Sequence, residues 1–174
     1  MSVSLKCHAF VLKKRQLLNN DLVIDLFTNS LGKIRVFAHG IRKITSRRGP
    51  HMETGNLIAV VVNRKGERYS LSETKLISGF SLIKENKNKL QALYLFLFVL
   101  ERILPEGEAE ELLFNFFKQF LVSLSREKDS HVLVMRYFNI MLKTLGYQEM
   151  DLDDSQLILY IEDLINEKLD RFNI

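Results

Sequence analysis

The chain has 174 residues, of which 47% are hydrophobic and 10% aromatic, and its net charge is +4 at pH 7. This apolar content is enough for one large or two small packed domains, and it excludes a disordered chain. A single cysteine, Cys7, excludes an internal disulfide framework and fits a reducing compartment. The longest apolar run, Ala92 to Leu100, is shorter than the roughly 18 residues of a membrane span, and no secretion signal is recognisable. We therefore expect a soluble cytoplasmic protein.

Short strand-like segments separated by turns fill the first 80 residues. Leu22, Ile24 and Leu26 recur at period two, which is typical of a strand with one buried face. The run Leu57 to Val62 is apolar throughout, so we expect a strand buried on both faces. The expected strands are 6–13, 21–28, 33–39, 57–62 and 68–73, with 75–80 continuing the sheet. Five short strands with glycine-containing turns predict a small antiparallel barrel.

The hydrophobic period becomes helical from about residue 86 onward. Pro105 and Gly107 end the first expected helix, Asp129 and Ser130 can cap the third, and Gly146 ends it. The expected helices are 86–104, 109–125, 131–145 and about 155–172. The sequence thus predicts an α+β protein, with a small antiparallel β-barrel over residues 1–82 and an all-helical domain over 83–174.

The charge is divided unevenly between the two halves of the chain. Residues 1–89 hold 17 Lys and Arg against 6 Asp and Glu, a net charge of +11. Residues 90–174 hold 8 against 15, a net charge of −7. This split indicates that the first half meets a polyanion and the second half does not.

No pattern in the sequence indicates catalysis or a metal site. Phosphate-binding loops, Gly-x-Ser-x-Gly and His-Glu-x-x-His motifs are all missing from the 174 residues. Cys7 and His8 would point to opposite faces of a strand, so they cannot share a metal. We expect a protein that is not an enzyme and that uses no cofactor and no metal.

The strongest positive signal is a basic segment with no Asp or Glu between Leu26 and Met52. In its strand, Ile34, Val36 and Ala38 are expected to point into the barrel. Cations interleaved with a ring on the outer face suit single-stranded nucleic acid, because cations bind phosphates and rings stack on unpaired bases. The candidate nucleic-acid-binding residues are Lys33, Arg35, Phe37, His39, Arg42, Lys43, Arg47 and Arg48. The alternative is a solvated basic hairpin with Phe37 packed under a neighbouring loop.

Three ordered blocks resemble the RecO family of bacterial recombination mediators. The first runs from Asp25-Leu26-Phe27-Thr28 through Gly32-Lys33-Ile34-Arg35-Val36-Phe37-Ala38-His39-Gly40-Ile41-Arg42 and continues into Ser46-Arg47-Arg48-Gly49. The second is Leu100-Glu101-Arg102-Ile103-Leu104 ahead of Leu113-Phe114. The third is Met135-Arg136-Tyr137-Phe138, leading to Leu142 and Leu145-Gly146-Tyr147. Together they cover roughly residues 5–150.

This resemblance implies an N-terminal OB-fold and a C-terminal helical domain. It also implies a protein that binds single-stranded DNA, anneals complementary strands, and works with RecR to load RecA onto DNA coated by single-strand-binding protein (SSB). Arg35, Arg42 and the segment 46–48 would then contact DNA, and Arg136 would anchor the carboxylates of the SSB C-terminal tail. An ion pair between Arg136 and Glu101 or another acid of the helical domain is the alternative.

Two departures from the family pattern accompany the resemblance. Many RecO proteins carry a four-cysteine zinc finger after the Gly-Tyr motif, whereas residues 151–155 contain no cysteine, so no zinc is expected. The chain is also shorter than is usual for the family, and the final helices are expected to be missing or rearranged. Outside the resemblance, a protein–protein adaptor with an acidic partner and an RNA-binding OB module are the rival interpretations.

Overall fold

The computed structural model describes residues 2–17, 21–40 and 49–172 and divides into two compact units. The first unit comprises residues 1–80 and 104–114, and the second comprises 81–103 and 115–174. The segment 104–114 therefore belongs with the strands, although the sequence pattern placed it in the helical half.

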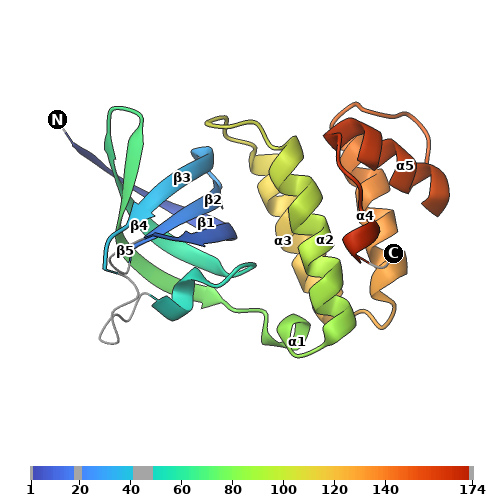
Figure 1. Cartoon of the computed structure of the whole chain (residues 1–174), viewed down its shortest axis with the longest axis horizontal. Coiled ribbons are helices and arrows are strands. Elements are labelled where there is room, and N and C mark those ends of the chain that lie inside the picture. The colour runs from blue at the N-terminus through green and yellow to red at the C-terminus, as the bar shows by residue number, and fades with distance from the viewer. Residues whose placement is uncertain (1, 18–20, 41–48, 173–174) are drawn as a thin grey trace. The chain divides into compact units, whose positions relative to one another are not determined.

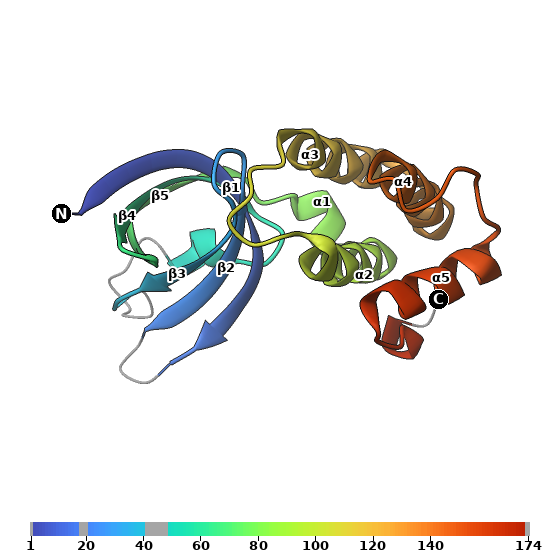
Figure 2. The same cartoon turned by 90° about the horizontal axis from the view of Figure 1, so that it is seen from above.

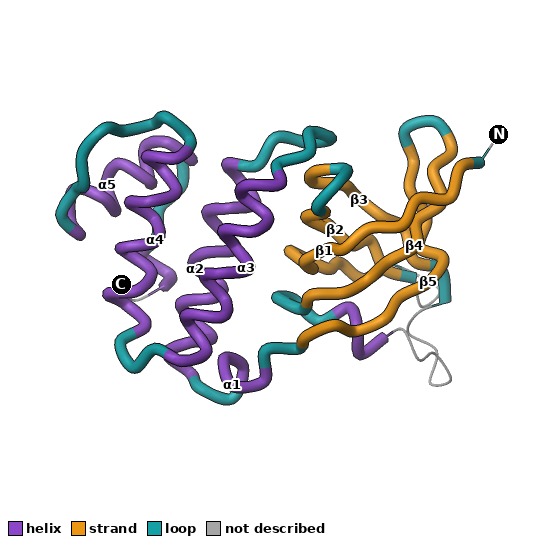
Figure 3. The backbone as a smooth tube through the Cα atoms, turned by 180° about the vertical axis from the view of Figure 1, so that it is seen from behind, coloured by secondary structure: helices purple, strands orange, loops and turns teal. Residues whose placement is uncertain are grey.

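The first unit is built around a closed five-stranded barrel (Figures 1 and 3). Its strands are β1 (Val3–Gln16), β2 (Leu22–Thr28), β3 (Gly32–Ala38), β4 (Leu57–Lys65) and β5 (Arg68–Ser78), and a 3₁₀ turn, η2 (Gly49–Met52), precedes β4. The strand order is β1-β2-β3-β5-β4, with β1 also paired to β4 and a short parallel pairing between β3 and β5. β1 curves around the barrel (Figure 2), and its bulge between Val11 and Lys13 is the kind of irregularity that bends a strand. The expected fold class, an OB-like barrel followed by helices, is confirmed.

Inward-facing aliphatic side chains from all five strands fill the barrel. Ile34, Val36 and Ala38 of β3 lie in this core, as the period-two pattern predicts. They pack with Leu22, Ile24 and Leu26 of β2 and with residues of β1, β4 and β5. The alternation of aliphatic residues therefore decides which face of each strand turns outward.

The strand that is buried on both faces is β2. Every residue of β2 is buried, including Val23, Asp25 and Phe27 on its outer face. The expectation of a doubly buried strand at 57–62 is wrong, because Ala59 and Val61 on the outer face of β4 are only partly buried. Because both side chains are apolar, the sequence pattern alone does not show that this face of β4 is partly exposed.

The second unit consists of helices packed around an aromatic core. The helices are α1 (Ser81–Lys84), α2 (Lys87–Ile103), α3 (Glu111–Arg126), α4 (Ser130–Thr144) and α5 (Asp154–Ile165), with a 3₁₀ turn, η3 (Asp170–Phe172). Phe96 of α2 stacks on Phe117 and Phe120 of α3 and on Phe138 of α4, with ring centroids 4.1–5.7 Å apart. These ring contacts join α2, α3 and α4 and stabilise helices that would be marginal in isolation.

Helix boundaries follow the expected capping residues with two exceptions. Asp129 caps α4 by accepting from the backbone of His131 and Val132, as expected. The fourth expected helix ends at Ile165 and not at Phe172, because Asn166 adopts a left-handed conformation (φ 53°). The single-turn helix α1 was not expected, since four residues are too few to show a period.

Candidate nucleic-acid interface

Three cross-strand rows form the outer face of β1, β2 and β3. Residues directly opposite each other in antiparallel strands share a face, so the pairing register defines the rows. The first row is Phe10–Phe27–Lys33, the second is Lys13–Asp25–Arg35, and the third is Arg15–Val23–Phe37.

Residues 104–114, which follow the strands in the sequence, cover the first row. This row contains Lys33, one of the residues predicted to bind nucleic acid. Phe114 lies 4.8 Å from Phe10 and 5.5 Å from Phe27, measured between ring centroids. Lys33 makes a backbone bridge to Glu106, and its carbonyl accepts a hydrogen bond from the N–H of Gly107 at 3.1 Å. Lys33 is partly buried. The acidic residues Glu106 and Glu108 beside it would repel a polyanion.

Gly32 allows this close approach of residues 104–114. Its φ is +66°, which favours glycine, and a Cβ at this position would lie 1.9 Å from the carbonyl oxygen of Glu108. The glycine of the family-like block thus has a packing role at the edge of the barrel.

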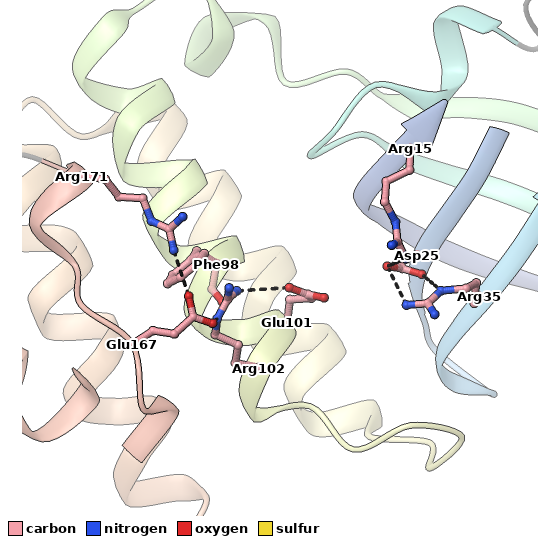
Figure 4. Close-up of polar contacts among 8 residues, drawn as sticks. All are labelled: Arg15, Asp25, Arg35, Phe98, Glu101, Arg102, Glu167 and Arg171. Atoms are coloured by element: carbon pink, nitrogen blue, oxygen red, sulfur yellow. Dashed lines mark hydrogen bonds and ion pairs between the residues drawn. The ribbon is translucent and has the colours of Figure 1, made fainter. Parts of the chain in front are cut away.

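The second row places two exposed cations on either side of one buried carboxylate. Asp25 is 5% exposed, whereas Lys13 and Arg35 are exposed. Arg35 donates from Nε to Oδ1 of Asp25 at 2.7 Å and from an Nη to Oδ2 at 3.3 Å (Figure 4). Arg15 of the third row also reaches Oδ2, at 3.9 Å. The outward direction predicted for Arg35 is confirmed, and its ion pair with Asp25 is new.

The third row combines a cation with an aromatic ring. Phe37 is partly buried beside Val23, and Arg15 is exposed at the other end of the row. The outward direction expected for Phe37 is confirmed by the inward positions of Val36 and Ala38. This row therefore offers a ring surface and a guanidinium on one face.

His39, the next sequence candidate, lies at the end of β3. It is exposed, and its Nδ1 lies 3.1 Å from Oδ2 of Asp21. The other oxygen of Asp21 accepts the backbone N–H of Gly40 at 2.7 Å, which holds the exit from the strand. The remaining barrel candidates, Arg42, Lys43, Arg47 and Arg48, lie outside the described residues.

Sequence reasoning missed Lys13, Arg15 and Asp25. The basic run 13–15 is visible in the sequence, but only the register of β1 against β2 places two of its members beside Arg35. Asp25 lies in the family-like block, but nothing in the sequence indicates that its carboxylate adjoins the basic residues. The register was the missing signal.

In the second unit, Arg136 is exposed on α4, and its guanidinium lies 5.8 Å from the ring centroid of Tyr137. Within the described part of the chain Arg136 has no ion pair, and the expected alternative partner Glu101 pairs instead with Arg102 at 3.2 Å. Val132 and Ile140, four residues to either side of Arg136, are 60% and 40% exposed. One stripe of α4 therefore presents a cation between two aliphatic side chains.

The described residues contain no group of three or more His, Cys, Asp or Glu side chains that could hold a metal ion. Burial raises the pKa of the Cys7 thiol to about 11, so this residue stays protonated at neutral pH. None of the helices in the described ranges is long and apolar enough to cross a membrane.

The first unit is thus an OB-like barrel whose outer face carries cations and a ring, and helices follow it in sequence. Residues 1–80 match the family model "Recombination protein O N terminal". The chain is 23% identical over 146 residues to "DNA repair protein RecO" of Prosthecochloris aestuarii, covering 82% of this chain and 55% of that protein. It is 27% identical over 143 residues to the protein of the same name from Clostridium novyi, covering 82% and 56%.

A third relative, "DNA repair protein RecO" of Desulforamulus reducens, is 28% identical over 110 residues, which cover 63% of this chain and 43% of that protein. The chain is thus similar to RecO proteins over 82% of its length, and the family model matches its first 80 residues. It spans a little over half the length of the first two relatives.

Proposed function

We propose that this protein binds single-stranded DNA on the outer face of β1, β2 and β3 and anneals complementary strands in DNA repair and recombination. The observation that carries this proposal is the pair of rows Lys13–Asp25–Arg35 and Arg15–Val23–Phe37, which place three cations and one ring on one sheet face. OB-folds bind oligonucleotides on the strands at this position of the barrel, and the names of the relatives fit a role in DNA repair.

In this role the protein makes and breaks no covalent bond. The cations bind phosphates and release counterions, Phe37 stacks on an unpaired base, and the mutual repulsion of two strands falls along a basic surface. The bases then supply the pairing energy. The proposal also includes His39 and the basic residues Arg42, Lys43, Arg47 and Arg48 among those that bind DNA.

The partners belong to the proposal as well. The expected partners are a RecR-like protein and SSB. Together with them, the protein would help RecA to load onto SSB-coated DNA. Arg136, between Val132 and Ile140, is the candidate anchor for the acidic and hydrophobic C-terminal tail of SSB. A guanidinium suits carboxylates, and the flanking aliphatic side chains suit apolar tail residues.

Fluorescence anisotropy with a labelled single-stranded DNA at several salt concentrations tests the DNA site. Each phosphate contact contributes a slope of about −0.7 in log affinity against log salt. Changing Arg42, Lys43, Arg47 and Arg48 together to Glu is expected to weaken binding by about tenfold or more and to flatten that slope. An unchanged slope would remove these four residues from the site.

Two matched titrations separate the rival functions. Negligible affinity for single-stranded DNA at about 0.15 M salt would favour a protein–protein adaptor. Equal or tighter binding of an RNA oligomer of the same sequence would favour an RNA-binding module.

A further inference from the structure

Asp25 is a buried acid at the centre of a surface that is otherwise basic. It lies on β2, directly opposite Lys13 of β1 on one side and Arg35 of β3 on the other. Its side chain is 6% exposed, while those of Arg15 and Arg35 are 54% and 50% exposed. A surface shaped only to maximise positive charge would not place a carboxylate here, so its presence requires a physical reason.

The geometry gives that reason, because one carboxylate orients two guanidiniums. Arg35 binds both oxygens of Asp25, at 2.7 and 3.3 Å, and Arg15 approaches Oδ2 at 3.9 Å (Figure 4). A two-point contact fixes the plane of a guanidinium as well as its position. Without the carboxylate, two like charges would remain close together and would repel each other.

We infer that Asp25 is a positioning residue that holds Arg15 and Arg35 as a preformed pair for one backbone phosphate of a nucleic-acid strand. This inference rests on the proposed function. It adds to that function two specific phosphate-binding arginines and the carboxylate that orients them. The side chains of Arg15 and Arg35 are half exposed, so a phosphate can reach both guanidiniums from solvent. Asp25 itself makes no contact with the phosphate.

Two effects of Asp25 on affinity oppose each other, and their balance is measurable. Its negative charge repels a polyanion, whereas its orientation of two long side chains reduces the ordering that binding requires. The inference requires the second effect to be the larger.

The test is Asp25→Asn, which keeps the shape of the side chain but removes its charge and one of its two acceptor oxygens. We expect affinity for a single-stranded oligomer to fall about fivefold at constant salt, although the protein gains one unit of positive charge. Glu73→Gln is the matched control, because it removes one exposed acid from β5 of the same barrel. This control is expected to leave affinity unchanged or slightly raised. A rise in affinity in Asp25→Asn would overturn the inference.

Arg35→Lys provides an independent test, because it keeps the charge and loses the two-point contact. We expect a similar drop in affinity, and Asp25→Asn added to Arg35→Lys is expected to cause little further loss. Additive losses would mean that Asp25 does not act through Arg35 and would contradict the inference. Thermal unfolding by circular dichroism checks that each variant is folded. If the unmodified protein shows no salt-dependent binding at all, the proposed function fails, whereas normal binding with a tighter Asp25→Asn variant refutes only the inference.

Discussion

The barrel and the helical unit each place two arginines around one carboxylate, Asp25 or Glu167, and in the helical unit Arg102 also pairs with Glu101 (Figure 4). The burial of the acid differs between the two clusters. In the barrel the acid, Asp25, is buried and its two arginines are half exposed. In the helical unit the acid, Glu167, is 43% exposed, and Arg102, which binds it at 2.6 Å, is only 22% exposed.

The helical cluster also encloses an aromatic ring. The guanidiniums of Arg102 and Arg171 lie 3.3 and 3.8 Å from the ring centroid of Phe98, and Glu167 binds both arginines. These arginines make their contacts within the unit and attach residues 166–172 to α2. Arginine count alone therefore says little about binding, because Arg102 is largely enclosed by the fold whereas Arg171, like Arg15 and Arg35, is about half exposed.

The largest expected effect comes from Arg35→Met in the barrel. Among the described residues, this change leaves the buried carboxylate of Asp25 with only the longer ion pair to Arg15, and we expect the free energy of unfolding to fall by about 2 kcal/mol. Urea denaturation measures it. An unchanged midpoint would show that Asp25 is adequately solvated without Arg35.

Arg102→Met in the helical unit is expected to lower the free energy of unfolding by about 1 kcal/mol through the lost cation–π and ion-pair contacts. Affinity for single-stranded DNA should not change, since Arg102 is only 22% exposed and already pairs with Glu101 and Glu167. Weaker DNA binding by the folded variant would contradict the expectation that Arg102, unlike the barrel arginines, takes no part in DNA binding.

Acid should weaken the attachment of residues 166–172 through Glu162. The ion pair with Lys168 and the N–H of Leu169 lower the pKa of this carboxyl below its ordinary value. Because the pKa is lower in the folded state, the stabilisation is present above the ordinary glutamate pKa, about 4.3, and is lost as pH falls through the folded value. The pKa of Glu167 is lowered in the same direction, first by its bond to Arg102.

The amide signal of Leu169 in ¹H–¹⁵N spectra from neutral to acidic pH reports this titration. It should shift with a midpoint below the ordinary value in the unmodified protein, and this shift should disappear in Glu162→Gln. A midpoint at or above the ordinary value would contradict the expected direction.

The smallest effect on stability is expected for Arg136→Ala. Its side chain is exposed, so the free energy of unfolding should change by less than about 0.5 kcal/mol. Binding of a peptide with the acidic, hydrophobic SSB tail should nevertheless weaken, as measured by calorimetry. Unchanged peptide affinity would remove Arg136 from the proposed partner site, and Lys143→Ala on the same helix is the matched control.

Much of the fold was predictable because hydrophobic periodicity and capping residues, which are local features of the sequence, indicate strands and helices. Alternating aliphatics identified β2 and β3 with their inward faces, and Asp129 marked the start of α4. The end of α5 at Asn166 could not be predicted, since an asparagine in a left-handed conformation looks like any polar residue in a helical pattern.

The candidate site was predictable only in part. The outward direction of Arg35 and Phe37 followed from the alternation within β3. The covering of the row that holds Lys33 depends on residues about 75 positions later in the chain, and no local pattern reveals such a contact.

The sequence by itself determined the OB-like barrel, the helices and the basic character of one strand, because periodicity and charge are local properties of the chain. Only the tertiary structure decided which cations meet. Strand register brings Lys13, Arg15 and Arg35 around Asp25, and register depends on how neighbouring strands pair, which the pattern within one strand does not reveal.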